Sequence, residues 1–145
     1  MNSNLVLTKH DQAIQIVSSF FDLMEAMKID QWIQLWAEDG VHHMPYAPPG
    51  FPNRVEGKKA IYSHFSVIPN RWKSIAFVNR RIYPMLSPDR VVAEYRGETE
   101  ISEGRSYNND YCSFFQLQEN QLISVTEYFN PLVLTQSFGD NLPKA

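Results

Sequence analysis

A chain of 145 residues, 43% of them hydrophobic and 20% charged, is expected to form one soluble domain with a core large enough to fold unaided. The net charge is −3 with a pI of about 5.8, and no Lys/Arg cluster could follow a phosphate backbone, so a nucleic-acid partner is not expected. A lone cysteine excludes an intrachain disulfide, and no apolar run approaches the roughly 18 residues of a membrane span. The N-terminal residues MNSN lack the basic-then-apolar pattern of a signal peptide. We therefore expect a cytoplasmic protein without membrane contact.

The first predicted element is a helix over residues 8–27. Thr8 and Asp11 form a variant of the capping box with which many helices begin. Apolar residues then recur at helical spacing and predict one face packed on a core: Ala13, Ile16, Val17, Phe20, Met24 and Met27.

A second, short helix is predicted over residues 30–37. Asp30 can cap its start, large apolar residues such as Trp32 and Trp36 anchor it, and Gly40 suits its end.

Residues 40–46 alternate like a strand. The segment PYAPPGFP, residues 45–52, holds four of the nine prolines and predicts a stiff apolar surface loop, placed as the lip of a pocket. A third helix is predicted over residues 57–68, and Pro69 ends it.

Four strands are predicted in the second half of the chain, because the helical period disappears after Lys73. Their connections are short and turn-like, so consecutive strands must be antiparallel. The expected fold is therefore α+β, with three N-terminal helices on a strongly curved, mainly antiparallel sheet. The predicted strands cover residues 74–85, 90–102, 106–118 and 121–131.

Both faces of this meander carry apolar side chains. One face must meet the helices, and the other still presents Tyr, Phe or Leu, which is more apolar surface than a monomer usually exposes. We therefore expect a homodimer through the outer face of the sheet.

Three motifs give the chain a family resemblance: RVEGKKAI (54–61), YNNDY (107–111) and EYFNP (127–131). Together with the order of the elements over residues 10–138, they resemble the SnoaL-like proteins of the nuclear-transport-factor-2-like superfamily, and among these the PhzA/PhzB proteins of phenazine biosynthesis. The resemblance implies one cone-shaped domain over residues 1–145 with tails at 1–7 and 139–145. It also implies a homodimer and one apolar pocket, open at one end.

The resemblance leaves the activity open, because this cystatin-like fold serves polyketide cyclases, ketosteroid isomerase-like enzymes, dehydratases and binding proteins. The first hypothesis is an enzyme that performs acid/base chemistry without a cofactor on a small apolar, cyclic or carbonyl-bearing metabolite. The reaction would be an isomerisation, cyclisation, condensation or dehydration. The alternatives are a non-catalytic module for a hydrophobic ligand and a protein–protein adaptor, which predicts a filled cone.

Glu127 is the first candidate catalytic residue. It shares a strand face with Val125 and Phe129, so it is expected to point inward, where lost hydration favours the neutral carboxyl and suits it to proton transfer. PhzA/PhzB-like proteins use a pocket glutamate at a position similar to this one as an acid/base group. The alternative is a structural Glu127 paired with Arg80, Arg81 or Arg96, or hydrogen-bonded to a tyrosine.

His64 and Asn109 are the other candidate catalytic residues. His64 lies on the apolar side of the third helix and could shuttle a proton or polarise a carbonyl, or be a core histidine bonded to the backbone. Asn109 is unfavourable in mid-strand and would face the pocket if its side of strand 106–118 lines the cone. A bulge would expose Asp110 to the pocket instead.

Candidate ligand contacts are a histidine and aromatic side chains that could wall a pocket for a flat apolar ligand: His42, Tyr46, Phe51, Trp72, Tyr95, Tyr111 and Phe129. His42 and His43 are adjacent in a strand and point to opposite faces, so they cannot chelate one metal ion. Neither a metal site nor a cofactor is indicated, since no ligand spacing or nucleotide-binding loop is present.

Overall fold

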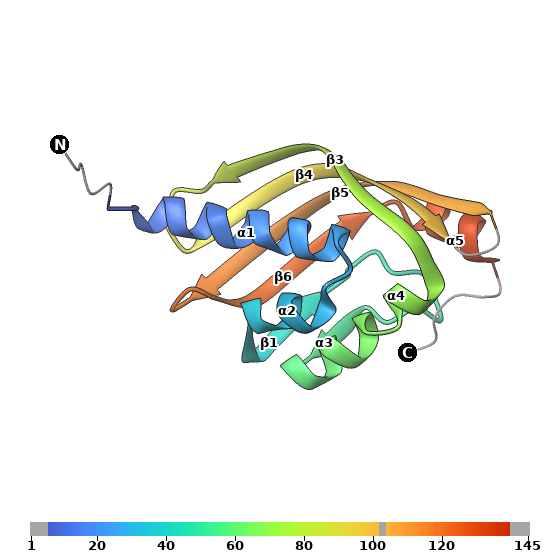
Figure 1. The fold of residues 1–145 in the computed structure, drawn as a ribbon, viewed down its shortest axis with the longest axis horizontal. Coiled ribbons are helices and arrows are strands. Elements are labelled where there is room, and N and C mark those ends of the chain that lie inside the picture. The colour runs from blue at the N-terminus through green and yellow to red at the C-terminus, as the bar shows by residue number, and fades with distance from the viewer. Residues whose placement is uncertain (1–5, 102–103, 140–145) are drawn as a thin grey trace.

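The computed structural model describes residues 6–101 and 104–139. Its centre is a six-stranded curved sheet with the strand order β2-β1-β6-β5-β4-β3, and helices cover the concave face (Figure 1). The strands are β1 (Trp36–His43), β2 (Arg54–Glu56), β3 (Trp72–Pro84), β4 (Arg90–Ile101), β5 (Arg105–Gln118) and β6 (Gln121–Phe129). The helices are α1 (Lys9–Glu25), α2 (Ile29–Trp32), α3 (Lys58–Phe65), α4 (Ile68–Arg71) and α5 (Pro131–Phe138), with a 3-10 turn, η1, at Ile33–Leu35.

The predicted meander is confirmed, since β3 to β6 pair antiparallel in chain order. Strand β1 adds to the other side of β6 in parallel, with His42 opposite Val125, and short β2 continues the sheet antiparallel to β1. The first and last parts of the chain thereby meet in the middle of the sheet.

Helix α1 begins with the predicted capping box, in which Thr8 and Asp11 each accept a hydrogen bond from the other's backbone N–H. Its buried face packs on the sheet, where Phe21 lies 4.5 Å from Tyr95 and Phe20 lies 5.1 Å from Phe115 between ring centroids. Burial of each such side chain contributes about 1.5–3 kcal/mol. This helix is therefore the main cover of one end of the concave face.

The end of α1 is fixed to β3 by polar contacts. The Glu25 carboxylate accepts the backbone N–H of Phe77 at 2.6 Å and pairs with Arg80, which also donates to Asp22 at 2.7 Å. The strand register shifts here, and Asn79 adopts a left-handed φ of 54°. The α1 carboxylates thus bind a bulge in the strand below.

The second helix differs from its prediction. Its N-cap position is Lys28, which makes no capping hydrogen bond through its side chain, and Asp30 lies inside the helix. The helix continues as a 3-10 turn to Leu35, and β1 starts at Trp36. Gly40 lies inside β1, where a Cβ would come 2.9 Å from Cε3 of Trp36. Gly40 is therefore required for close packing on the tryptophan and does not end a helix.

Three short elements were not predicted: β2, α4 and α5. Pro69 lies in the first turn of α4. Backbone N–H groups in the first turn of a helix have no acceptor within the helix, so the N–H that proline lacks is not needed there. The last predicted strand, 121–131, ends early at Phe129 because Asn130 caps α5 by accepting the N–H of Leu132 at 3.0 Å and Pro131 starts that helix. The predicted tails at 1–7 and 139–145 lie largely outside the described residues.

Across residues 6–101 and 104–139, no helix is both long and apolar enough to cross a membrane.

The capping box yields a stability prediction. Thr8→Ala removes the side-chain acceptor of the Asp11 N–H and should lower the free energy of unfolding by about 1 kcal/mol in a urea titration. Gln15→Ala, in the middle of the same helix, should change it by less than about 0.5 kcal/mol. An equal effect of the two substitutions would show that the cap does not stabilise α1.

Candidate functional site

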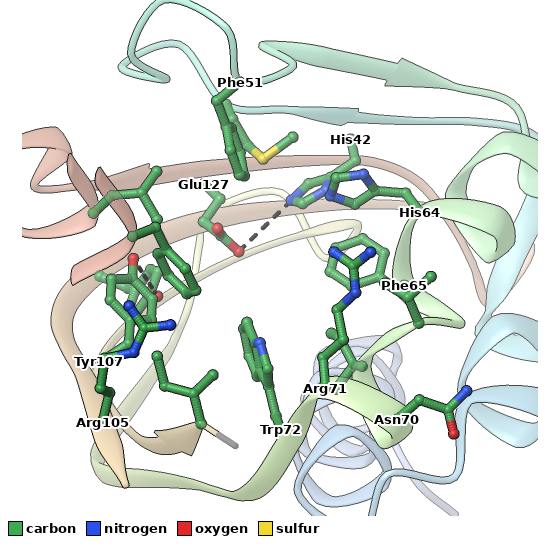
Figure 2. Close-up of a pocket in the computed structure, with 17 residues that line it drawn as sticks. His42, Phe51, His64, Phe65, Asn70, Arg71, Trp72, Arg105, Tyr107 and Glu127 are labelled. Atoms are coloured by element: carbon green, nitrogen blue, oxygen red, sulfur yellow. Dashed lines mark hydrogen bonds and ion pairs between the residues drawn. The ribbon is translucent and has the colours of Figure 1, made fainter. Parts of the chain in front are cut away.

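A cavity of about 400 Å³ lies between the concave face of the sheet and α3, α4 and α5. Figure 2 shows side chains from these elements directed toward one space, with Phe51 of the Pro-rich loop at its edge. The exposed surface of the wall is mainly apolar, and the residues that bring polar groups to it are His42, His64, Asn70, Arg71, Arg105, Tyr107, Tyr111 and Glu127. An apolar pocket of this size with a few polar groups is typical of a small-molecule site.

Glu127 lines this cavity, as its inward strand face predicted. Its Oε2 lies 3.6 Å from Nε2 of His42, and the two side chains are 20% and 2% exposed (Figure 2). The contact follows from the sheet, since His42 is opposite Val125 on the parallel neighbour strand and Glu127 is two residues further on the same face.

His42 is an unusual side chain, because it is buried and neither ring nitrogen has a hydrogen-bond partner within the described part of the chain. The 3.6 Å separation from Glu127 is longer than a hydrogen bond but within ion-pair range. Buried polar atoms are rarely left unpaired, so a ligand or water at this point would complete the site.

The arginines that could have made Glu127 structural have other partners or positions. Arg80 pairs with Asp22 and Glu25. Arg96 pairs with Glu98 at 3.6 Å and Asp110 at 3.2 Å, and Arg81 is exposed. Among the described ion pairs, the partner of Glu127 is the histidine in the cavity.

His64 reaches the same cavity from α3, and its ring lies 4.9 Å from that of Phe65. Burial lowers the pKa of His64 below 6.5, the proximity of His42 lowers it further, and Glu127 partly raises it. The imidazole is therefore neutral at pH 7, and its contribution to stability is lost as the pH falls below 6.5, where the unfolded chain takes up the proton first.

Asn109 faces inward with Tyr107 and Tyr111, so the prediction that this face of β5 points toward the inside of the cone is correct. It does not line the cavity, however. Its amide donates to the Tyr107 hydroxyl at 2.9 Å and is otherwise bonded to backbone groups of Asp110 and Asn130. It can reach a ligand only through Tyr107.

The predicted aromatic contacts divide into two groups. Phe51, Trp72 and Tyr111 line the cavity. Tyr95 is absent from the main cavity but lines a smaller, deeper one. Its ring stacks on that of Tyr111 at 5.1 Å, and its hydroxyl is hydrogen-bonded to that of Ser113 at 2.8 Å.

Phe129 and Tyr46 also lie outside the main cavity. The Phe129 ring supports the wall from 6.3 Å behind Phe51. Tyr46 is 58% exposed and packs on Tyr128, because β1 ends at His43 and a turn follows from Met44. The prediction of a strand through residue 46 was wrong at this point.

A smaller cavity of about 90 Å³ lies deeper, toward α1. Its wall includes Phe20 and Met24 of α1, and it shares Glu127, Tyr111 and Trp72 with the main cavity. Gly97 forms part of its floor, and a Cβ there would lie 3.0 Å from Cε2 of Tyr111. The carboxylate of Glu127 thus borders both spaces.

Sequence reasoning missed several cavity residues, chiefly those on unpredicted elements: Arg71 from α4, and Leu134 and Phe138 from α5. The Asn130–Pro131 pair was the available signal for α5. Tyr107 is two residues from Asn109 and therefore shares its strand face, but it was not predicted as a site residue. No group of three or more potential metal ligands occurs among residues 6–101 and 104–139.

A curved sheet that closes around one apolar cavity, with a carboxylate and two imidazoles inside, defines a small-molecule site in a cone-shaped fold. The chain belongs to the SnoaL-like domain family, whose model matches residues 17–125. It is 29% identical over 136 residues to the uncharacterised protein YesE of Bacillus subtilis, covering 93% of this chain and 92% of that one. It is also 27% identical over 128 residues to an uncharacterised PhzA/B-like protein of Pseudomonas aeruginosa, covering 88% and 90%.

Solved structures show the same fold. A Bacillus subtilis protein described as a candidate isomerase has a TM-score of 0.86 and 28% identity, covering 95% of this chain and all of that one. A candidate polyketide cyclase of Xanthomonas campestris has a TM-score of 0.76 and 19% identity, covering 90% and 98%. A Burkholderia xenovorans protein described as nuclear-transport-factor-2-like has a TM-score of 0.70 and 18% identity, covering 87% and 95%.

The electrostatics of the cavity yield a pH prediction. In an NMR titration the pKa of His64 should lie below 6.5, because burial and His42 disfavour its protonation. Glu127→Gln should lower this pKa further, since it removes a negative neighbour that raises it.

Glu38→Gln is the control, because Glu38 is 91% exposed and does not line the cavity. It should leave the His64 titration unchanged. An unchanged His64 pKa in the Glu127→Gln protein would show that the two side chains are not coupled.

Proposed function

We propose that this protein is an enzyme that transfers a proton on a small apolar ligand bearing a carbonyl group, without a cofactor. The observation that carries the proposal is the Glu127 carboxylate beside the His42 imidazole, whose ring nitrogens have no hydrogen-bond partner among the described residues, inside one apolar cavity. An apolar wall binds the body of a ligand, while the polar pair supplies an acid and a base beside it.

Glu127 is the base that takes a proton from a carbon atom next to the carbonyl group. His42 lies 3.6 Å from it and can exchange that proton, since its ring nitrogens bond no other described residue. His64, neutral at pH 7, stands at the same cavity as a second group able to accept or donate a proton.

Isomerisation or cyclisation is the reaction type that this arrangement favours. The descriptions of the Bacillus subtilis and Xanthomonas campestris structures as candidate isomerase and polyketide cyclase support that class. The adaptor hypothesis expected a filled cone, and the 400 Å³ cavity argues against it.

The second candidate function is the binding of an apolar ligand without chemistry. It is favoured by the presence of one carboxylate, Glu127, among the described residues of a cavity that is walled mainly by apolar and aromatic side chains. The two functions share the cavity and differ in whether Glu127 is needed for turnover or only for affinity.

The test uses a small β,γ-unsaturated cyclic ketone, whose conversion to the conjugated isomer is followed by ultraviolet absorbance. Glu127→Gln keeps the shape of the side chain and removes the base, so it should slow the conversion by about 10²-fold or more. Glu38→Gln, which is exposed, should convert the ketone at the wild-type rate.

Equal rates in the wild-type and Glu127→Gln proteins would contradict the assignment of Glu127 as the base. A wild-type protein that binds such ketones and isomerises none of them would favour the binding function.

A homodimer through the outer face of the sheet is part of the same proposal. That face carries Phe114, which is 41% exposed, and Tyr128, which packs between Phe114 and Tyr46. Aromatic side chains on a sheet face that the described helices leave uncovered favour burial against a second copy of the chain.

Sedimentation at micromolar concentration tests the dimer. The wild-type protein should sediment at twice the 16.8 kDa chain mass. Phe114→Glu should sediment at the single-chain mass, because an unpaired charge would be buried at the contact. Leu86→Glu, at a fully exposed turn outside the sheet face, should leave the dimer intact. A wild-type monomer would refute the dimer.

A further inference from the structure

The side-chain amide of Asn109 has a fixed orientation, because backbone groups contact both of its ends. Its Oδ1 accepts the backbone N–H groups of Asp110 at 2.9 Å and Asn130 at 3.2 Å. Its Nδ2 donates to the backbone carbonyl of Asn130 at 3.0 Å. A backbone N–H can only donate and a carbonyl can only accept, so a flipped amide would lose all three bonds.

This orientation determines the direction of the contact with Tyr107. The remaining Nδ2 hydrogen of Asn109 is donated to the Tyr107 hydroxyl oxygen at 2.9 Å. Tyr111 donates its hydroxyl proton to the same oxygen at 3.1 Å. Tyr107 thus accepts two hydrogen bonds, and none of the hydrogen bonds found between described residues takes its own proton.

Tyr107 lines the main cavity, as do Glu127 and His42. In Figure 2, Glu127 lies between His42 and Tyr107 around this space. A polarised phenol with an unused proton therefore borders the cavity that contains the carboxylate.

We infer that Tyr107 is a catalytic residue that donates a hydrogen bond to the carbonyl oxygen of the ligand, with Asn109 and Tyr111 as positioning residues. The ligand class is thereby narrowed to enolisable ketones, whose oxygen becomes negative during the reaction. This inference rests on the proposed function for the reaction, but the hydrogen bond itself can be tested without turnover.

The proton and electron balance is simple. Glu127 removes a proton from the carbon atom next to the carbonyl, and the electron pair of that C–H bond forms a C=C bond. The π pair of the carbonyl moves onto oxygen, where the Tyr107 O–H donates a hydrogen bond without transferring its proton. The carboxylic acid of Glu127 then returns the proton at a different carbon atom, so no other reactant is consumed.

The ionisation of Tyr107 agrees with this role. Burial raises the pKa of Tyr107 above 10, and the hydrogen bonds from Tyr111 and Asn109 partly lower it. The hydroxyl therefore remains protonated at neutral pH. The two incoming bonds polarise it and make it a stronger donor than an isolated phenol.

The test measures binding of para-nitrophenol, whose anion presents a negatively charged phenolate oxygen, against para-nitroanisole, which has the same ring but no anionic form. Titrations are followed by absorbance at about pH 8.5, below the range in which tyrosine ionises. Tyr107→Phe should weaken binding of the phenolate about tenfold or more, as expected for a lost hydrogen bond to a charged group. Binding of the anisole should change by less than about twofold.

Tyr111→Phe keeps the Tyr107 donor and removes one polarising bond, so it should weaken phenolate binding by a smaller factor. Tyr46→Phe is the matched control, because Tyr46 is exposed away from the cavity, and it should bind both probes like the wild type. The inference fails if Tyr107→Phe binds the phenolate as tightly as the wild type, or if its affinity for both probes falls by the same factor. It also fails if the wild type binds the anisole more tightly than the phenolate.

This binding result is independent of the isomerisation assay. Loss of phenolate affinity in Tyr107→Phe together with a catalytically inactive wild type would refute the proposed reaction and retain the oxygen-binding role. Unchanged phenolate affinity together with Glu127-dependent isomerisation would retain the reaction and refute the role of Tyr107.

Discussion

The attachment of Glu25 to the bulge in β3 determines where the cavity can form. Glu25 accepts the Phe77 N–H and pairs with Arg80, so α1 ends above this point of the sheet. Beyond it, the described helices over the cavity are α3, α4 and α5, which have four to eight residues each. Short helices cannot fill a strongly curved sheet with side chains, and an apolar space remains between them. The fold therefore separates a packed half under α1 from a hollow half.

The polar groups of the site come together because three strands are neighbours in the sheet. His42, Glu127 and Tyr107 lie on β1, β6 and β5, which are adjacent in that order. Each side chain points inward by the ordinary alternation of its own strand. The sheet thus places an imidazole, a carboxylate and a phenol along one wall, and aromatic side chains from the helices and the loop oppose them.

Local patterns predicted much of this arrangement. The alternation of side chains along β5 and β6 predicted that Asn109 and Glu127 face inward, and the short turns predicted the antiparallel meander. The parallel pairing of β1 with β6 joins residues more than 80 positions apart and leaves no local signal, so the contact of His42 with Glu127 could not be predicted. Asn109 was correctly placed on the inner face, but its hydrogen bonds depend on the turn at Asn130, whose helix cap went unrecognised.

The absence of one methyl group at Gly97 sets how far a ligand can extend past Glu127. A Cβ at this position would lie 3.0 Å from the Tyr111 ring, which itself stacks on Tyr95 and has little room to yield. A larger residue would close the inner space of about 90 Å³ and leave Glu127, His42 and Tyr107 in position. Ligand length and reaction chemistry are therefore determined by different residues. Proteins of this architecture could diverge in the size of molecule they accept through a single codon while retaining one proton-transfer mechanism.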